Sequence, residues 1–396
     1  MLHGGDIYTR KIKYDFSVNT NPNPCPGEIM EAISGSLKYI GNYPDPLQRR
    51  VRHELSLLEG IKEEYIICGN GASDLLMAGV QAIKPRVAYL ICPCFYGYRH
   101  ALNSCQDIVV KEYYLREEEN FILGNSLLDK VHDDIVSDFH NSDKKSPGIL
   151  FLTNPNNPSG KNISPEVIEN LLDTCSRCNI SVILDECFLR MSDKGVSFKK
   201  KVLSYNNLYV VDAFTKLFSV PGIRAGYMIS NKDNIENIKR YLHEWNLSIP
   251  GEAALVAGAK LLRKSDFCEK TRSIIREERK YLYEELRNIY LINSLSEKTE
   301  LRDIESKTES KALSKTESKT ESKHAFTLMD SDTSFILFKA NESGLKLFDK
   351  LLEEGILIRS CKGFSGLNQD WYRIAVKSHE ENKILISHLK RMFENV

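Results

Sequence analysis

The stretch Leu208–Lys216, which reads LYVVDAFTK, joins an apolar run to a polar end that closes on a lysine. Comparable apolar, β-branched runs bounded by turn residues recur along the first half of the chain, and helical patterns lie between most of them. These runs are Tyr65–Cys68, Val87–Ile91, Gly148–Leu152 and Ser181–Leu184. Strands that alternate with helices predict an α/β fold whose mainly parallel sheet is covered by helices on both faces.

The helical patterns set the expected domains. Helices are predicted over Ser73–Ile83 and Pro165–Cys178, the second with Ser164 as its N-cap. After about Asn231, long helices are predicted over Lys239–Lys264 and Phe267–Ile289, followed by a strand-helix-strand region. That region runs from Ser334 to Val376 and indicates a separate small domain.

We therefore expect three parts. Residues 1–40 form an N-terminal arm and part of the small domain, 41–235 a large cofactor-binding domain, and 236–396 an interdomain helix and the C-terminal small domain. Within the last part, residues 295–323 repeat Ser-Lys-Thr-Glu and contain almost no large apolar residues. Such a segment cannot bury enough surface to offset its ordering entropy, so we expect a low-complexity surface insertion.

Composition narrows the class of protein. The 396 residues contain 54 Lys and Arg against 54 Asp and Glu, so no basic field indicates nucleic-acid binding. No apolar segment is long enough to predict a membrane span, and no signal peptide is apparent, so we expect a cytoplasmic protein without a membrane partner. The ten cysteines lack the spacing of a disulfide framework or a zinc site, and we expect reduced thiols and no metal.

Residues with useful chemistry follow each predicted strand, at the edge where ligands collect in parallel sheets. Gly71-Ala72-Ser73 opens a helix whose free amides suit a phosphate, and Phe95 offers a ring on which a planar ligand could stack. Asn157 belongs to a rigid turn rich in proline and asparagine. Asp185, if buried, requires a cationic partner such as a protonated pyridine nitrogen. Lys216, if buried, would have a lowered pKa and could form a Schiff base.

Each of these features alone has an ordinary structural explanation, since glycine turns before helices are common and most lysines are surface charges. Together they supply an amine, an anionic partner, a stacking ring, an amide and a phosphate cradle. That set is what an aldehyde-bearing pyridine phosphate requires.

With these residues the chain resembles the fold-type I pyridoxal-phosphate enzymes, aminotransferase class I/II, over nearly its whole length apart from the insertion. It is most similar to the branch that holds threonine-phosphate decarboxylases and histidinol-phosphate aminotransferases. The resemblance implies a large domain with a mainly parallel seven-stranded sheet between helices, and a smaller C-terminal α/β domain. It also implies pyridoxal 5′-phosphate as cofactor and a homodimer with shared active sites.

The resemblance assigns roles to individual residues. Lys216 would carry the cofactor, Asp185 would pair with the ring nitrogen, Asn157 would bind the phenolic oxygen and Phe95 would stack on the ring. The phosphate would rest on Gly71, Ala72, Ser73, Thr215 and Arg224, with Tyr43 reaching across from the second subunit. Two positions depart from the family pattern: Ala213 replaces a Ser or Thr phosphate ligand, which puts some cofactor affinity in doubt, and Phe188 replaces a tyrosine of histidinol-phosphate aminotransferases.

The substrate side favours one reaction. Arg373 matches the arginine that binds a substrate carboxylate, and Arg359 matches one that binds a substrate phosphate. His3, in His3-Gly4-Gly5, and Asn19, in the segment Asp15–Asn19, look more like threonine-phosphate decarboxylase. They would complete a site for a small phosphorylated amino acid.

We therefore predict a lyase that decarboxylates O-phospho-L-threonine to aminopropanol phosphate, a cobamide building block. Two alternatives stay open: an aminotransferase acting on histidinol phosphate or another amino acid, and a non-catalytic protein that kept the fold. Residue types alone do not separate phosphothreonine from phosphoserine, because one methyl group contributes only about 1–3 kcal/mol.

Overall fold

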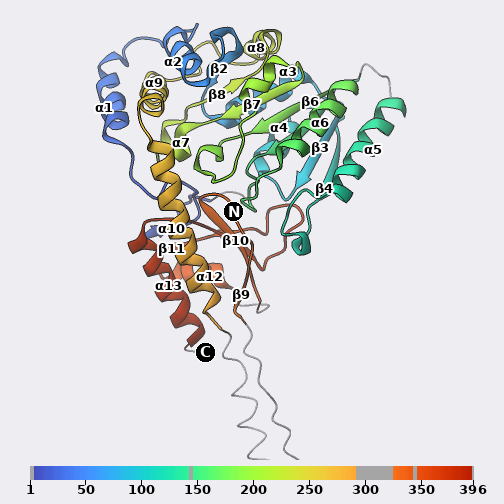
Figure 1. Cartoon of the computed structure of the whole chain (residues 1–396). Coiled ribbons are helices and arrows are strands. Elements are labelled where there is room, and N and C mark those ends of the chain that lie inside the picture. Colours follow the sequence, from blue (N-terminus) through green and yellow to red (C-terminus); the bar gives the residue numbers. More distant parts are fainter. Residues whose placement is uncertain (1–3, 142–145, 291–323, 342–345, 395–396) are drawn as a thin grey trace, which may run out of the picture.

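The structure, a computed structural model, describes residues 4–141, 146–290, 324–341 and 346–394. Two main sheets organise it. The large sheet fills the upper part of Figure 1, the smaller sheet lies below it, and the long helix α10 (Phe267–Arg287) runs from one part to the other. In the part of the chain that is described, no helix has both the length and the apolar composition to cross a membrane.

The large sheet has seven strands in the order β2-β8-β7-β6-β5-β3-β4, and all of them except β8 point the same way. The strands are β2 (Ile66–Gly69), β3 (Val87–Cys92), β4 (Val109–Tyr114), β5 (Gly148–Thr153), β6 (Ile180–Asp185), β7 (Leu208–Asp212) and β8 (Gly226–Ile229). The predicted α/β class is confirmed, and five strands lie where apolar runs predicted them. β4 and β8 were not predicted: β4 is a partly exposed edge strand, and β8 is a short antiparallel strand without an apolar run of its own beyond Tyr227–Ile229.

Side chains alternate between two cores along each strand of this sheet. In β5, Ile149 and Phe151 belong to one core, and Leu150 and Leu152 to the other. Both faces are therefore buried, which explains why these strands are continuously apolar. One face is covered by α3 (Ala72–Ile83), α4 (Tyr96–Leu102) and α8 (Lys232–Lys239), and the other by α1 (Gly27–Ser36), α2 (Arg49–Glu59), α5 (Asn125–Asn141), α6 (Pro165–Arg177) and α9 (Ile249–Lys264).

The smaller sheet has the order β12-β13-β10-β9 and is antiparallel. Its strands are β9 (Phe326–Leu328), β10 (Phe335–Ala340), β12 (Arg359–Ser360) and β13 (Trp371–Ala375). Beside it, β1 (Tyr14–Asp15) pairs in parallel with β11 (Ile356–Leu357), and Phe16 enters the core that this sheet shares with α10, α12 (Leu347–Glu353) and α13 (His379–Glu394). The domain boundaries at residues 40 and 235 stay a prediction, and the insertion at 295–323 lies outside the described residues.

One predicted helix is wrong. The sequence predicted a continuous helix over Lys239–Lys264, whereas α8 ends at Lys239 and α9 begins only at Ile249. The side chain of Ser248 caps α9 by accepting a hydrogen bond from the Gly251 amide at 3.1 Å, and Pro250 lies in its first turn. Proline fits the first turn of a helix but not its interior, so Ser248 and Pro250 mark a new start.

The described part of the chain also contains short helices. They are α7 (Phe214–Leu217) and the 3-10 helices η1 (Leu37–Tyr39), η2 (Glu63–Tyr65), η3 (Glu117–Glu119), η4 (Leu189–Met191), η5 (Lys199–Leu203) and η6 (Pro221–Ile223). The predicted cap of α6 is confirmed, since the Ser164 side chain accepts from the Val167 amide at 3.3 Å. All ten cysteines are free thiols.

Candidate active site

A cleft of about 230 Å³ lies at the carboxyl ends of β5, β6 and β7, where residues of the smaller sheet also reach it. Parallel pairing brings these ends together, since Thr153 is the partner of Asp185 in register. The residues that line the cleft are Gly4, Ser17, Val18, Asn19, Ala72, Ser73, Phe95, Tyr96, Thr153, Asn157, Asp185, Cys187, Phe188, Ala213, Thr215, Lys216, Arg224, Arg359, Gly363, Phe364 and Arg373.

Lys216 lies in α7, directly after β7, with its side chain at the cleft. Burial lowers the pKa of its amine to about 8, and the positive charges of Arg373 and Arg224 act in the same direction. The backbone of Lys216 is fixed by a hydrogen bond, which the Asn21 amide donates to the Lys216 carbonyl at 2.9 Å. Near neutral pH a larger fraction of this amine is therefore neutral and nucleophilic than in an ordinary lysine.

Asp185 ends β6 with its carboxylate at the same cleft. Burial raises the pKa of Asp185, while hydrogen bonds from the Cys187 amide at 3.0 Å and from Tyr98 Oη at 2.9 Å oppose the rise. Tyr98 Oη also lies 2.7 Å from Thr153 Oγ1. A buried carboxylate that faces a cavity is suited to a cationic partner in that cavity.

The sequence reasoning missed Tyr98 as a site residue. It lies three positions after Phe95 at the start of α4, so both rings point to one side of the helix, and they meet edge to face at 5.6 Å. The i, i+3 spacing of two aromatic residues next to a strand end was the available signal.

The turn that opens α3 and the Arg224 side chain form a site at the cleft that suits an anion. Gly71 precedes α3 with a φ of 85°, and Ala72 and Ser73 open the helix at the cleft wall. A Cβ atom at Gly71 would lie 2.5 Å from Arg224 Nη2, so only glycine allows this guanidinium to approach the turn. The free amides and positive end of α3 together with the Arg224 charge suit a phosphate.

Two buried arginines come from the smaller sheet. Arg359 in β12 and Arg373 in β13 are partners in register, and both are buried at the cleft. Arg373 donates to Asn157 Oδ1 through Nη1 and to the Ser17 carbonyl through Nη2 at 3.0 Å. With its amide oxygen turned toward Arg373, Asn19 accepts from Nε and Nη1 at 3.2 Å.

Burial lowers the pKa of Arg373 to about 10, and the neighbouring charge of Arg359 contributes to the shift. Two guanidinium groups side by side with depressed pKa values are stabilised by an anionic ligand.

The cleft therefore brings together most of the residues expected from the sequence. Tyr43 does not line it; its side chain is 79% exposed and packs against Trp245 with ring centroids 4.8 Å apart. Gly71 is not among the lining residues, although the adjacent Ala72 is, and His3 lies outside the described residues. The departures Ala213 and Phe188 both line the cleft, and Phe188 packs edge to face on Phe335 at 5.1 Å.

Comparison with known proteins accounts for this arrangement. The family model described as aminotransferase class I and II matches residues 11–389. The chain belongs to this family. A protein of Caldanaerobacter subterraneus subsp. tengcongensis, provisionally named as a threonine-phosphate decarboxylase, is 32% identical over 99% of this chain and 94% of its own length.

Two further relatives carry the names of two different activities. The threonine-phosphate decarboxylase of Salmonella typhimurium is 25% identical over 96% of this chain and 92% of its own length. The solved histidinol-phosphate aminotransferase of Clostridium acetobutylicum is 27% identical with a TM-score of 0.77, and the match covers 97% of this chain and 100% of that one. The chain is thus an enzyme of the class I and II aminotransferases, whose cofactor is pyridoxal 5′-phosphate.

The cleft fits this cofactor by its own chemistry. The Lys216 amine, the buried carboxylate of Asp185 and the glycine-lined cradle beside Arg224 match the aldehyde, the ring nitrogen and the phosphate of pyridoxal phosphate. Phe95 lies at the cleft wall as a ring on which the pyridine could stack. Ala213 offers no hydroxyl, whereas Thr215 and Ser73 bring hydroxyl groups to the cleft lining.

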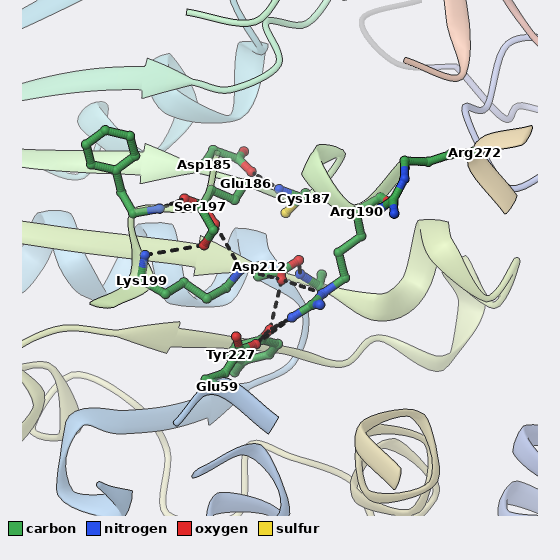
Figure 2. A network of polar contacts seen from close by, with 12 residues as sticks. Glu59, Asp185, Glu186, Cys187, Arg190, Ser197, Lys199, Asp212, Tyr227 and Arg272 are labelled. Carbon is green, nitrogen blue, oxygen red and sulfur yellow. Dashed lines mark hydrogen bonds and ion pairs between the residues drawn. The ribbon is translucent and has the colours of Figure 1, made fainter. Parts of the chain in front are cut away.

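Figure 2 shows a buried network of charged and polar side chains next to the strand ends that carry Asp185 and Lys216. Lys199 Nζ lies 2.9 Å from both Glu186 Oε2 and Asp212 Oδ2. Asp212 also accepts from Tyr227 Oη at 2.8 Å, and Arg190 lies 3.3 Å from Asp212 and 2.6 Å from Glu59. Because Glu186 adjoins Asp185, and Asp212 ends the strand that leads to Lys216, the network ties together the strand ends that carry the site.

Proposed function

We propose that this enzyme decarboxylates O-phospho-L-threonine to aminopropanol phosphate. The observation that carries the proposal is the pair of buried arginines, Arg359 and Arg373, on neighbouring strands at the cleft. A substrate with two anionic groups, a carboxylate and a phosphate, complements two such cations, whereas an ordinary amino acid offers only one. The threonine-phosphate decarboxylases among the relatives support the same choice.

Each charged residue has a task in this proposal. Arg373, held by Asn157 and the Ser17 carbonyl, presents a fixed fork to the carboxylate that is lost. Arg359 binds the phosphate, and Gly4 of the N-terminal segment lines the same cleft. His3, which lies outside the described residues, is proposed as a second phosphate ligand.

In this proposal the bond between the α-carbon and the carboxylate is broken at the cleft that Lys216 and Asp185 line. Bound at this site, pyridoxal phosphate supplies an electron sink for that bond. The buried Asp185 carboxylate would keep the ring nitrogen of this cofactor protonated through a charge-assisted hydrogen bond. A proton must replace the carboxylate that leaves as CO₂, and the amine of Lys216, whose pKa burial lowers to about 8, would deliver it to the α-carbon.

The test is to incubate the loaded enzyme with O-phospho-L-threonine without a keto-acid acceptor. We expect release of CO₂ and formation of aminopropanol phosphate, and no product from the Lys216→Ala variant. Product that appears as a keto acid, and only when 2-oxoglutarate is added, would overturn the proposal.

A second measurement tests the phosphate site. Arg359→Gln should lower kcat/KM for phosphothreonine by about 30-fold or more, because a buried charge pair is broken, while activity on unphosphorylated threonine changes little. Equal losses on both substrates would remove Arg359 from phosphate binding.

The second candidate is transamination of histidinol phosphate or another amino acid. It is favoured by the high structural similarity to the Clostridium acetobutylicum enzyme, and it uses the same cofactor site. The acceptor dependence of the first assay separates the two reactions.

We also propose that the functional unit is a homodimer. Four large apolar side chains are exposed within residues 37–43, and the exposed Trp245 packs against one of them, Tyr43; the four are Leu37, Tyr39, Ile40 and Tyr43. A second copy would cover them and bring its Tyr43 toward the cofactor phosphate. Ile40→Glu should yield monomers by sedimentation with impaired cofactor binding, and a wild-type monomer with full activity would refute this assembly.

A further inference from the structure

The loop from Cys361 to Asp370 connects the strands that carry the two arginines, β12 and β13. Two of its residues, Gly363 and Phe364, line the active-site cleft. The Phe364 ring lies beneath the Arg359 guanidinium, 5.4 Å from centroid to Cζ. The position of this loop therefore determines the surface on which Arg359 rests.

Ser365 joins the loop to the edge strand β4 of the large sheet through contacts with Glu112 and Tyr114. Ser365 Oγ donates to Glu112 Oε2 at 2.7 Å, and Glu112 lies on the edge strand β4. Tyr114 Oη donates to the same oxygen at 2.6 Å, and Arg99 pairs with the other oxygen of the carboxylate. Burial opposes the ionisation of Glu112, but these hydrogen bonds outweigh it and hold its pKa below the usual value.

Backbone geometry reinforces the contact between the loop and β4. Gly366 has a φ of 90°, and a Cβ atom there would lie 2.7 Å from Cδ1 of the Tyr114 ring. The loop therefore packs its bare backbone against the same strand that holds Ser365. Beside this contact, a cavity of about 370 Å³ lies between loop residues 362–367 and the large domain, lined on the other side by Phe95, Tyr96 and Arg99. Cys361, Phe364 and Leu367 of the loop pack against the main hydrophobic core, while the cavity leaves Ser365 as a polar contact between the loop and β4.

We propose that Glu112 and Ser365 form a positioning latch that holds loop 361–370 against the large domain and thereby sets the affinity for the substrate phosphate at Arg359. The two residues do not line the active-site cleft, so they act through Phe364 and Gly363. The assignment rests on the proposed phosphate role of Arg359. It names a determinant of substrate binding on a strand that carries none of the residues expected from the sequence.

The chain offers a matched control for a contact between the same two parts. Lys339 in β10 lies 3.0 Å from Glu117, which follows β4, and this ion pair does not involve the loop. Lys339→Met should therefore leave substrate binding unchanged if the latch acts through the loop.

The experiment compares steady-state kinetics on O-phospho-L-threonine. Ser365→Ala and Glu112→Gln should each raise KM about five- to tenfold with kcat nearly unchanged, as expected when a hydrogen bond to a charged group is lost. The double variant should be no worse than either single variant, and Ser365→Thr should restore the wild-type KM. Titration of the apoenzyme with pyridoxal phosphate should give the same dissociation constant throughout. Unchanged KM, additive effects or an equal effect of Lys339→Met would overturn the latch.

A readout without substrate separates failure of the latch from failure of the proposed reaction. Amide hydrogen exchange at loop residues 361–370 should be faster in Ser365→Ala than in wild type and unchanged in Lys339→Met. If wild type does not decarboxylate phosphothreonine but this difference is present, the latch stands and the substrate assignment fails. If exchange is the same in all three proteins, the latch is refuted.

Discussion

The buried lysine of the charge network gives the most direct test of how the site is held together. Lys199 is 3% exposed and bridges Glu186 and Asp212, both buried. Burial opposes its charge, but Asp212 and Glu186 outweigh this and raise the pKa of Lys199. Lys199→Met keeps an unbranched apolar side chain of similar length and removes the cation. Breaking a buried pair in this way leaves uncompensated charge, which costs about 3–5 kcal/mol of unfolding free energy.

The pH dependence of this loss has a definite sign. In the wild type, Lys199 and Arg190 outweigh burial and hold the pKa of Asp212 below its usual value, so its stabilisation is present above that value and is lost as pH falls through the lowered pKa. In Lys199→Met the main opposing cation is gone, so burial should move the pKa of Asp212 upward. Protonation then stabilises the variant in mild acid, and the stability difference should shrink between about pH 8 and about pH 5.

Urea unfolding of the apoprotein, followed by tryptophan fluorescence, measures this difference. Lys201→Met is the matched control: this lysine lies 2.6 Å from Glu169, but the two side chains are 47% and 41% exposed. An exposed pair contributes about 0–1 kcal/mol, so the control should be nearly as stable as wild type. A Lys199→Met protein that matches the control, or a loss that does not change with pH, would refute the account of the network.

Three further predictions concern the cleft. Lys216→Ala should lose pyridoxal phosphate on gel filtration, and the wild-type apoenzyme should recapture it faster as pH rises through about 8, the pKa of the buried amine; a rate independent of pH would contradict this. Tyr98→Phe should weaken cofactor binding about tenfold, because it removes a hydrogen bond to the Asp185 carboxylate, and an unchanged dissociation constant by absorbance titration would contradict it. Arg373→Lys should lower kcat/KM about 100-fold, because lysine cannot reproduce the fork held by Asn157, and a loss below about fivefold would show that the fork is not used.

Burial explains which strands could be predicted from the sequence. Apolar runs such as Val182–Leu184 predicted their strands because both faces of the sheet are buried, so every residue of the run is apolar. The break between α8 and α9 was overlooked even though Ser248 and Pro250 are local signals for a helix start. The edge strand β4 gave no comparable signal, since only part of it is buried.

The sequence alone determined which residues could serve the cofactor, because Asp185 ends a strand, Lys216 and Asn157 come shortly after one, and parallel strands end at one edge of a sheet. Only the tertiary structure decided what surrounds them. Tyr98 reaches Asp185 across 87 positions, Arg373 reaches Asn157 across 216, and Ser365 reaches Glu112 across 253. The first contact depends on how α4 packs on the large sheet, and the other two depend on how the segments of the smaller sheet meet the large one. No local pattern of residues specifies that packing.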